Sequence, residues 1–187
     1  MSIALVGMPG SGKSTAGRHL AKRLGWRFVD TDALIEGRIG GTIRSYFEQE
    51  GEQAFRGVEA AVIAEVSTQE RVVLATGGGA VLLVENRAAL RAGCDVVYLR
   101  TSPEELSRRL RNDQQRPMLQ VADPQARLRQ LLAERDPLYR EAAHFIIETG
   151  RPTVQALTGM ILAQLELAGI VGSHGVDTPS SPRPGKA

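Results

Sequence analysis

Short apolar runs along this chain alternate with longer segments whose apolar residues recur at helical spacing. The runs contain β-branched residues and predict strands that are buried on both faces of a parallel sheet. Strands that alternate with helices indicate βαβ units with helices on both faces of the sheet. We therefore expect an α/β fold, a three-layer sandwich around a five-stranded parallel sheet, with strands at residues 2–6, 26–29, 72–75, 95–99 and 144–148.

The segments outside these strands predict helices at residues 14–24, 33–70, 85–92, 103–111, 125–135 and 154–168. The helical region at residues 33–70 is expected to be interrupted near Gly40-Gly41 and Gly51. Gly25 is placed to stop the first helix. Ser102 or Thr101 is placed to cap the helix at residues 103–111.

Two segments lack a regular apolar pattern. Residues 112–124 are polar and broken by two prolines, so we expect a mobile loop there. Residues 171–187 are rich in Gly, Ser and Pro without a periodic apolar face, which predicts a disordered tail. Residues 1–170 then have the length of a single domain.

Composition excludes several classes of protein. The 187 residues are 42% hydrophobic and 24% charged, with a net charge of +2 and scattered basic residues. A nucleic-acid-binding surface normally shows as clustered Lys and Arg, so we expect no nucleic-acid partner. No apolar run is long enough to span a membrane, and the N-terminus lacks the charged region of a signal peptide. The single cysteine, Cys94, excludes an internal disulfide. We expect a protein of the cytoplasm, and we expect it to be a monomer.

Residues 7–14 read G-M-P-G-S-G-K-S and satisfy the phosphate-binding pattern G-x-x-x-x-G-K-[ST]. A predicted strand precedes them and a predicted helix follows, as this P-loop requires. Its glycines let backbone N–H groups surround phosphate oxygens, and the helix N-terminus adds its positive dipole end. Lys13 would reach the β- and γ-phosphates, and the Ser14 hydroxyl would ligate Mg²⁺.

The P-loop alone does not separate a kinase from a GTPase or a motor-type ATPase. The chain has no N-K-x-D sequence for reading guanine, and its third predicted strand ends in Ala75-Thr76 without a carboxylate. Asp30 and Asp32 instead end the second predicted strand, at the edge where ligands bind in open α/β sheets. In an extended stretch they would point the same way, one toward a metal-bound water and one toward the acceptor hydroxyl. Asp32 could alternatively cap the next helix.

The order and spacing of further motifs resemble those of shikimate kinases over roughly residues 2–167. Beside the P-loop, which many families share, the chain has D-T-D at 30–32, G-E-Q-A-F-R at 51–56, G-G-G at 77–79, R-P at 116–117 and R-D-P-L-Y at 135–139. The resemblance implies a P-loop kinase similar to nucleoside monophosphate kinases, with a substrate-binding region at about residues 31–60 and a lid at about 111–124. Its reaction would move the γ-phosphate of ATP to the 3-hydroxyl of shikimate, in the pathway to chorismate and aromatic amino acids.

The resemblance also implies how the acceptor is bound. Asp32 would contact the shikimate hydroxyls and accept the proton of the attacking one, and Arg56 and Arg135 would grip the carboxylate. The Gly78 N–H, flanked by Gly77 and Gly79, would also contact the substrate. Three further side chains would line the pocket: Phe47, Phe55 and Glu59.

For ATP, the resemblance implies a site built on the P-loop residues Gly10, Ser11, Gly12, Lys13, Ser14 and Thr15. Arg109 would stack on adenine, and Arg116 on the lid would reach the phosphates during catalysis. Arg151 is nearest to the arginine that usually helps to seat adenine, although the stretch T-G-R-P at 149–152 is one residue shorter than the family spacing. Asp30 would hold a water of the Mg²⁺.

Two alternatives stay open at this point. The chain could be a kinase for another small polyol or acid such as gluconate, against which the G-E-x-x-F-R and R-x-P-L-Y stretches argue. It could also be a catalytically silent P-loop protein that binds nucleotide for regulation or assembly. The combination of Lys13, Ser14, Asp32 and Arg116 argues against that second possibility.

Overall fold

The computed structural model describes residues 1–111 and 122–172, and its centre is a parallel sheet with the strand order β2-β3-β1-β4-β5. The sequence predicted all five strands, and no strand end is displaced by more than two residues. The strands are β1 (Ile3–Val6), β2 (Arg27–Asp30), β3 (Val72–Ala75), β4 (Asp95–Thr101) and β5 (Phe145–Thr149).

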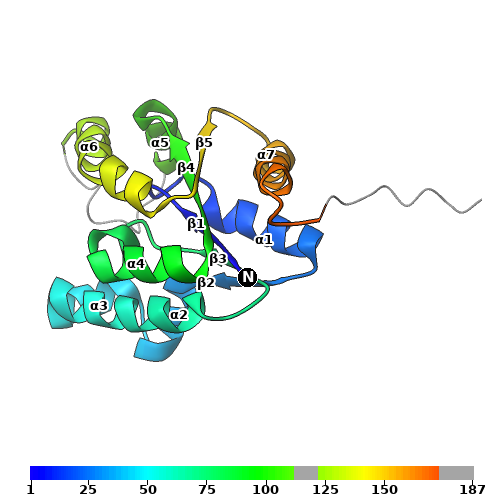
Figure 1. Cartoon of the computed structure of the whole chain (residues 1–187). Coiled ribbons are helices and arrows are strands. Elements are labelled where there is room, and N and C mark those ends of the chain that lie inside the picture. The colour runs from blue at the N-terminus through cyan, green and yellow to red at the C-terminus, as the bar shows by residue number, and fades with distance from the viewer. Residues whose placement is uncertain (112–121, 173–187) are drawn as a thin grey trace, which may run out of the picture.

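Helices cover both faces of the sheet, which confirms the predicted three-layer sandwich (Figure 1). Alternate residues of β1 supply the two cores: Ile3 and Leu5 pack with α1 and α7, and Ala4 and Val6 pack with α3, α4 and α6. The helices are α1 (Lys13–Leu24), α2 (Thr31–Ile39), α3 (Ile43–Ser67), the 3₁₀ turn η1 (Ala80–Leu82), α4 (Val84–Gly93), α5 (Pro103–Leu110), α6 (Pro124–Ala142) and α7 (Val154–Leu167).

The predicted interruptions of the second helical region are confirmed. Gly40 ends α2 in the left-handed conformation, and Gly51, with φ 84° and ψ 173°, kinks α3. A positive φ of this kind is favourable only for glycine, so the kink is fixed by the sequence at that residue. It turns the second part of α3, which carries G-E-Q-A-F-R, toward the sheet core through Phe55.

The helix predicted at residues 125–135 is longer, because α6 continues through Pro137 to Ala142. A proline inside a helix costs about 3 kcal/mol through its missing N–H and its ring. Tertiary packing offsets that cost here: Tyr139 and Ala142 are fully buried, and the Tyr139 ring stacks on Tyr98 with centroids 4.9 Å apart. The predicted end at residue 135 was wrong, because the local sequence does not show this long-range contact.

Parts of the predicted loop and tail are described. Asp123 caps α6 by accepting from the Ala126 N–H at 2.9 Å, whereas Arg116 and the rest of residues 112–121 lie outside the described residues. Val171, assigned by sequence to the tail, is 8% exposed and packs into the core beneath α1 and α7. Residues 173–187 lie outside the described residues. Within the described residues, no helix has the length and apolar character that crossing a membrane requires.

Candidate active site

The carboxyl ends of three strands meet at one edge of the sheet. The register pairs Asp30 of β2 with Ala75 of β3, and Ala75 with Leu5 of β1. The P-loop follows β1, the D-T-D sequence begins at the end of β2, and T-G-G-G follows β3. The topology therefore gathers three motifs that are far apart in the sequence, at the edge where open α/β sheets bind ligands.

The P-loop wraps the start of α1 as its sequence predicts. Gly12 has φ 94° immediately before the helix, a conformation that a side chain would strain. The ammonium of Lys13, which is 7% exposed, donates to the carbonyls of Gly7 at 2.9 Å and Met8 at 2.8 Å. The loop thus holds a buried cation at the N-terminus of a helix, which favours a phosphate ligand.

The two carboxylates after β2 are arranged differently from the prediction. Asp30 caps α2, since its Oδ1 accepts from the N–H of Asp32 at 3.1 Å and of Ala33 at 3.4 Å. The helix begins at Thr31, so Asp32 is neither the cap nor part of an extended stretch with Asp30. The other Asp30 oxygen accepts from the Ser14 hydroxyl at 2.6 Å. One carboxylate therefore joins the P-loop, and the other is displaced by the helical turn toward residues 77–79.

Residues 77–79 are the meeting point of a set of polar side chains that we call the glycine-loop cluster: Asp32, Arg56, Glu59, Arg135 and Tyr139. A Cβ atom on Gly77 would lie 2.5 Å from Asp32 Oδ1 and 3.3 Å from Glu59 Oε1. A Cβ atom on Gly79 would lie 2.6 Å from the Arg56 guanidinium. On the P-loop side, a Cβ on Gly78 would meet the Pro9 ring at 2.6 Å. Side chains on this loop would fill the space that the cluster uses.

Arg56 is held by carboxylates on its own helix. Its guanidinium donates to Glu59 at 2.6 Å and to Glu52 at 3.3 Å, and it lies over the Phe55 ring, 5.2 Å from the centroid. Glu59 is 1% exposed, and this burial raises its pKa while Arg56 lowers it. Phe47 packs against Phe55 with ring centroids 4.5 Å apart, so both predicted aromatic residues lie beside Arg56.

Within the glycine-loop cluster, Arg135 has an unmet hydrogen-bonding capacity. Its side chain comes from α6, is 6% exposed, and its Nη1 has no hydrogen-bond partner among the described residues. Burial raises the pKa of Glu59 and of Tyr139, and the Arg135 charge opposes that rise in both, so this guanidinium lies near these groups. A buried guanidinium with an unpaired N–H is suited to bind an anion, because leaving it unpaired is costly.

Tyr139 is a residue of this cluster for which sequence analysis predicted no role. Its hydroxyl donates to the Gly78 carbonyl at 2.6 Å, on the loop that the cluster surrounds. Burial raises the pKa of Tyr139 to about 12. Its place in R-D-P-L-Y, one helical turn after Arg135, was the available signal.

A separate cleft of about 410 Å³ lies beside the P-loop, and we call it the arginine cleft. Arg109 donates to the carbonyls of Gly10 at 3.1 Å and Gly150 at 3.3 Å. The cleft brings together the predicted residues Arg109, Arg151 and Thr15, and its lining comprises Gly10, Gly12, Thr15, Ala16, Arg108, Arg109, Arg151, Pro152, Val154 and Leu157. Despite its shortened spacing, Arg151 lines this cleft together with Arg109.

Glu105 was also missed by sequence reasoning. Its carboxylate contacts the arginines of this cleft, although it stands in the first turn of α5 beside Glu104, where acidic residues are common. Nothing in the local pattern distinguishes the two glutamates.

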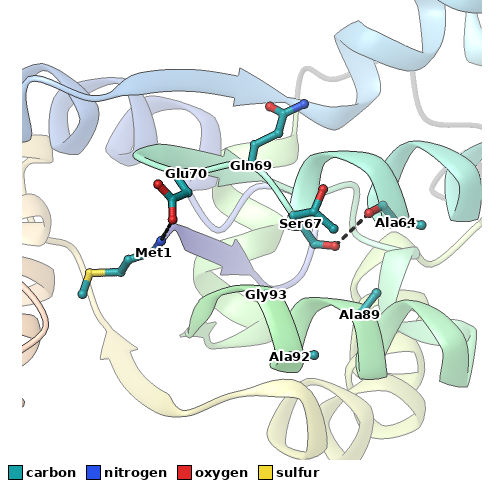
Figure 2. A pocket seen from close by; sticks show the side chains of 9 residues that line it. Met1, Ala64, Ser67, Gln69, Glu70, Ala89, Ala92 and Gly93 are labelled. Atoms are coloured by element: carbon teal, nitrogen blue, oxygen red, sulfur yellow. Dashed lines mark hydrogen bonds and ion pairs between the residues drawn. The ribbon is translucent and has the colours of Figure 1, made fainter.

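A second hollow of similar volume, about 420 Å³, lies at the amino-terminal side of the sheet between the ends of α3 and α4 (Figure 2). Met1, Ser67, Glu70, Ala89 and Gly93 are among its lining residues, and the Met1 ammonium lies 3.8 Å from Glu70. Its walls are largely alanine, glycine and short polar side chains, and none of the described site residues lines it. The chemistry is therefore concentrated at the opposite edge.

Comparisons with known proteins agree with this geometry. The family profile described as shikimate kinase matches residues 9–166. A shikimate kinase of Paracidovorax citrulli is 59% identical over 174 residues, covering 91% of this chain and 94% of the relative. One of Ralstonia nicotianae is 51% identical over 180 residues, covering 96% and 95%. A solved structure, shikimate kinase from Acinetobacter baumannii in complex with shikimate, has a TM-score of 0.86 and 48% identity, covering 90% and 93%.

The profile match extends over residues 9–166, which hold most of the P-loop, the glycine-loop cluster and the arginine cleft. The resemblance inferred from motifs is thus confirmed by overall similarity in sequence and in structure. This chain belongs to the shikimate kinase family and is an ATP-dependent kinase of the shikimate pathway.

Proposed function

We propose that this chain transfers the γ-phosphate of ATP to the 3-hydroxyl of shikimate, which gives shikimate 3-phosphate and ADP. The observation that carries the choice of acceptor is the buried Arg135 guanidinium, whose Nη1 has no partner among the described residues. A small acceptor that carries a carboxylate would supply the missing anion. The relative from A. baumannii, whose structure contains shikimate, supports this assignment.

The glycine-loop cluster would bind the acceptor from three sides. Arg135 and Arg56 would grip its carboxylate, since guanidinium groups bind carboxylates with two parallel hydrogen bonds. Asp32, beside Gly77, would contact the hydroxyls and take the proton of the attacking one as its oxygen bonds to phosphorus. The Gly78 N–H would add a backbone contact, and Phe47, Phe55 and Glu59 would line the pocket.

ATP would lie with its phosphates in the P-loop and its adenine in the arginine cleft. Backbone N–H groups of residues 10–15 and the Lys13 ammonium would hold the phosphates and stabilise the leaving ADP oxygen. Arg109 and Arg151 would flank the base. Pro9 lies against Gly78 between the two regions, so the P-loop adjoins the acceptor loop as an in-line transfer requires.

The oxygen ligands beside the P-loop are suited to Mg²⁺, which would neutralise charge on the β- and γ-phosphates. Ser14 Oγ lies 2.6 Å from Asp30 Oδ2, and hydroxyl and carboxylate oxygens are the ligands this ion prefers. The described residues contain no cluster of three or more candidate metal ligands, which is compatible with an ion held mainly by phosphates and water. Ser14 would ligate directly and Asp30 through water.

We also propose that Arg116 acts from a lid at about residues 111–124, which lies largely outside the described residues. An arginine brought onto the γ-phosphate can raise the rate of related P-loop enzymes by roughly 10³–10⁵. Arg116→Ala should lower kcat at least about a hundredfold and change shikimate affinity much less, and Arg116→Lys should rescue only part of the loss. A variant that loses thermal stability but keeps kcat would remove Arg116 from the reaction.

The domain would act as a monomer in the cytoplasm, without nucleic acid or membrane as a partner. The large apolar side chains that are exposed among the described residues come from the N-terminus, η1, α4, β5 and α7. Light scattering during size-exclusion chromatography would test the oligomeric state.

The deciding experiment measures ADP release with shikimate, with gluconate and with no acceptor. We expect turnover with shikimate alone, and none in Lys13→Ala. Lys22→Ala, which changes an exposed lysine on the same helix, is the matched control and should retain activity. Turnover with gluconate would favour a different polyol kinase, and nucleotide binding without turnover would favour a silent P-loop protein.

A further inference from the structure

One carboxylate at the arginine cleft contacts three guanidinium groups. Glu105 lies in the first turn of α5 and is 5% exposed. Its Oε1 accepts from Arg108 Nη2 at 2.6 Å and from Arg109 Nε at 2.8 Å. Its Oε2 accepts from Arg108 Nε at 3.0 Å and from Arg151 Nε at 3.2 Å. A carboxylate has about four acceptor sites, so these contacts use its capacity fully.

The contacts fix Arg109 by its edge. Its Nε is bound to Glu105, and its two terminal nitrogens donate to the carbonyls of Gly10 and Gly150. Hydrogen bonds to protein thus occupy all three nitrogens along the edge of the guanidinium. What this guanidinium offers to a ligand is its flat face, which suits an aromatic ring.

Arg151 depends on Glu105 more completely. Its side chain is 77% exposed, and its contact with Glu105 is its one hydrogen bond among the described residues. An ion pair with so exposed a partner adds little to folding stability. Its consequence is geometric, because it keeps a long and otherwise rotatable side chain at the wall of the cleft.

We propose that Glu105 is a positioning residue of the nucleotide site, which orients Arg109 and Arg151 so that they form the walls that receive the adenine of ATP and ADP. This inference rests on the proposed function of the arginine cleft as the adenine site. Glu105 does not touch the nucleotide; it acts through the two arginines. Its removal should therefore weaken nucleotide binding and leave the acceptor site unchanged.

Glu104 provides the matched comparison. It occupies the same helical turn and has the same favourable position relative to the helix dipole, but its partner is Arg129 at 3.4 Å, away from the cleft. A role of Glu105 that came only from the helix N-terminus would be shared by Glu104.

The experiment compares Glu105→Gln with Glu104→Gln by calorimetry, with ADP and with shikimate in separate titrations, and by steady-state kinetics. We expect Glu105→Gln to raise the Kd for ADP and the KM for ATP about tenfold, or about 1.4 kcal/mol, with kcat and the Kd for shikimate within about twofold. Glu104→Gln should leave all four quantities unchanged. Unchanged ADP affinity in folded Glu105→Gln, or an equal loss for shikimate, would overturn the proposal.

A double-mutant cycle tests whether Glu105 acts through the arginine. Adding Glu105→Gln to Arg109→Ala should weaken ADP binding less than it does in the wild-type background, because the group that it orients is gone. Full additivity would contradict the proposal. If Glu105→Gln does not fold, Glu105→Asp keeps the charge on a shorter side chain; it should weaken ADP binding severalfold, and unchanged binding would reject the role. Wild-type protein that fails to bind ADP at all would instead reject the proposed function.

Discussion

Arginines serve the glycine-loop cluster and the arginine cleft in different ways. In the glycine-loop cluster, the buried Arg135 keeps an N–H without a partner among the described residues. In the arginine cleft, Glu105 and two backbone carbonyls occupy every nitrogen of Arg109. The first arrangement leaves hydrogen-bonding capacity for an anion, and the second leaves a flat surface for a ring.

The carboxylates that accompany these arginines differ as well. Burial is the main influence on Glu59 and raises its pKa, whereas hydrogen bonds from Arg108 are the main influence on Glu105 and lower its pKa to about 2. The same residue types therefore build two kinds of site. Both carboxylates are almost fully buried, so the difference depends on how many donors surround each of them.

The largest expected effect concerns Asp32, which we place at the reacting hydroxyl. Asp32→Asn keeps the shape of the side chain but cannot accept a proton, so kcat should fall by about 10²–10⁴-fold. Calorimetry should show ADP affinity unchanged. Asp95→Asn, at the amino end of β4 and thus at the other edge of the sheet, is the control and should keep kcat. Activity near that of the wild type in Asp32→Asn would remove this residue from the mechanism.

Replacing Arg135 or Arg109 by alanine should affect the binding of different ligands. Loss of one partner from a desolvated charged pair costs on the order of 2–5 kcal/mol, so Arg135→Ala should weaken shikimate binding at least tenfold. ADP affinity should be nearly unchanged in that variant. Arg109→Ala should show the reverse pattern, with weaker ADP binding and unchanged shikimate binding. Equal loss of both ligands in either variant would end the distinction between an anion-binding and a ring-binding arginine.

Tyr139 sharpens the comparison on the acceptor side, because its hydroxyl links α6 to the Gly78 carbonyl. Tyr139→Phe removes that link and should raise the KM for shikimate by about three- to tenfold, because one such hydrogen bond contributes about 0.5–1.5 kcal/mol. The KM for ATP should not change.

The stacked partner supplies the control for that variant. Tyr98→Phe loses a hydrogen bond to Asp136 of 2.8 Å that does not involve residues 77–79. Both variants should lower thermal stability, but only Tyr139→Phe should change the KM for shikimate. A change of KM in both would show that the stack, not the hydroxyl, supports the site.

The smallest expected effect is a difference in pH dependence of stability. A carboxylate with a lowered folded pKa stabilises the fold above its unfolded pKa, ordinarily 4.5, and loses that contribution as pH falls toward about 2. Wild-type protein should therefore gain stability over Glu105→Gln as pH rises from 3 to 7. Glu59 has a raised pKa, so its contribution is present at low pH and is lost as pH rises through the folded pKa.

Thermal midpoints of wild type, Glu105→Gln and Glu59→Gln between pH 3 and 7 would show how the stability difference between wild type and each variant changes with pH. The wild-type advantage over Glu59→Gln should shrink with rising pH, opposite in sign to that over Glu105→Gln. Slopes of the same sign would mean that the two carboxylates are not in contrasting environments.

Local sequence was sufficient wherever neighbouring residues carry the physical cause. The apolar runs located all five strands, since a strand of a covered parallel sheet must be apolar on both faces. The P-loop pattern placed Lys13 and Ser14, because glycine spacing and the following helix define that loop. Family motifs then named residues on α2, α3 and α6 that the topology does bring to one glycine loop.

Tertiary structure decided what depends on contacts across the chain. Asp30 and not Asp32 caps α2, because the helix begins at Thr31. The helix α6 continues beyond Pro137, where Tyr139 stacks on Tyr98 with ring centroids 4.9 Å apart. Glu104 and Glu105 are equivalent in the local pattern, yet only the fold sets Arg151 beside one of them. A sequence specifies which groups are present and how they repeat along an element, whereas the partner that a charge or a ring meets depends on how the elements pack together.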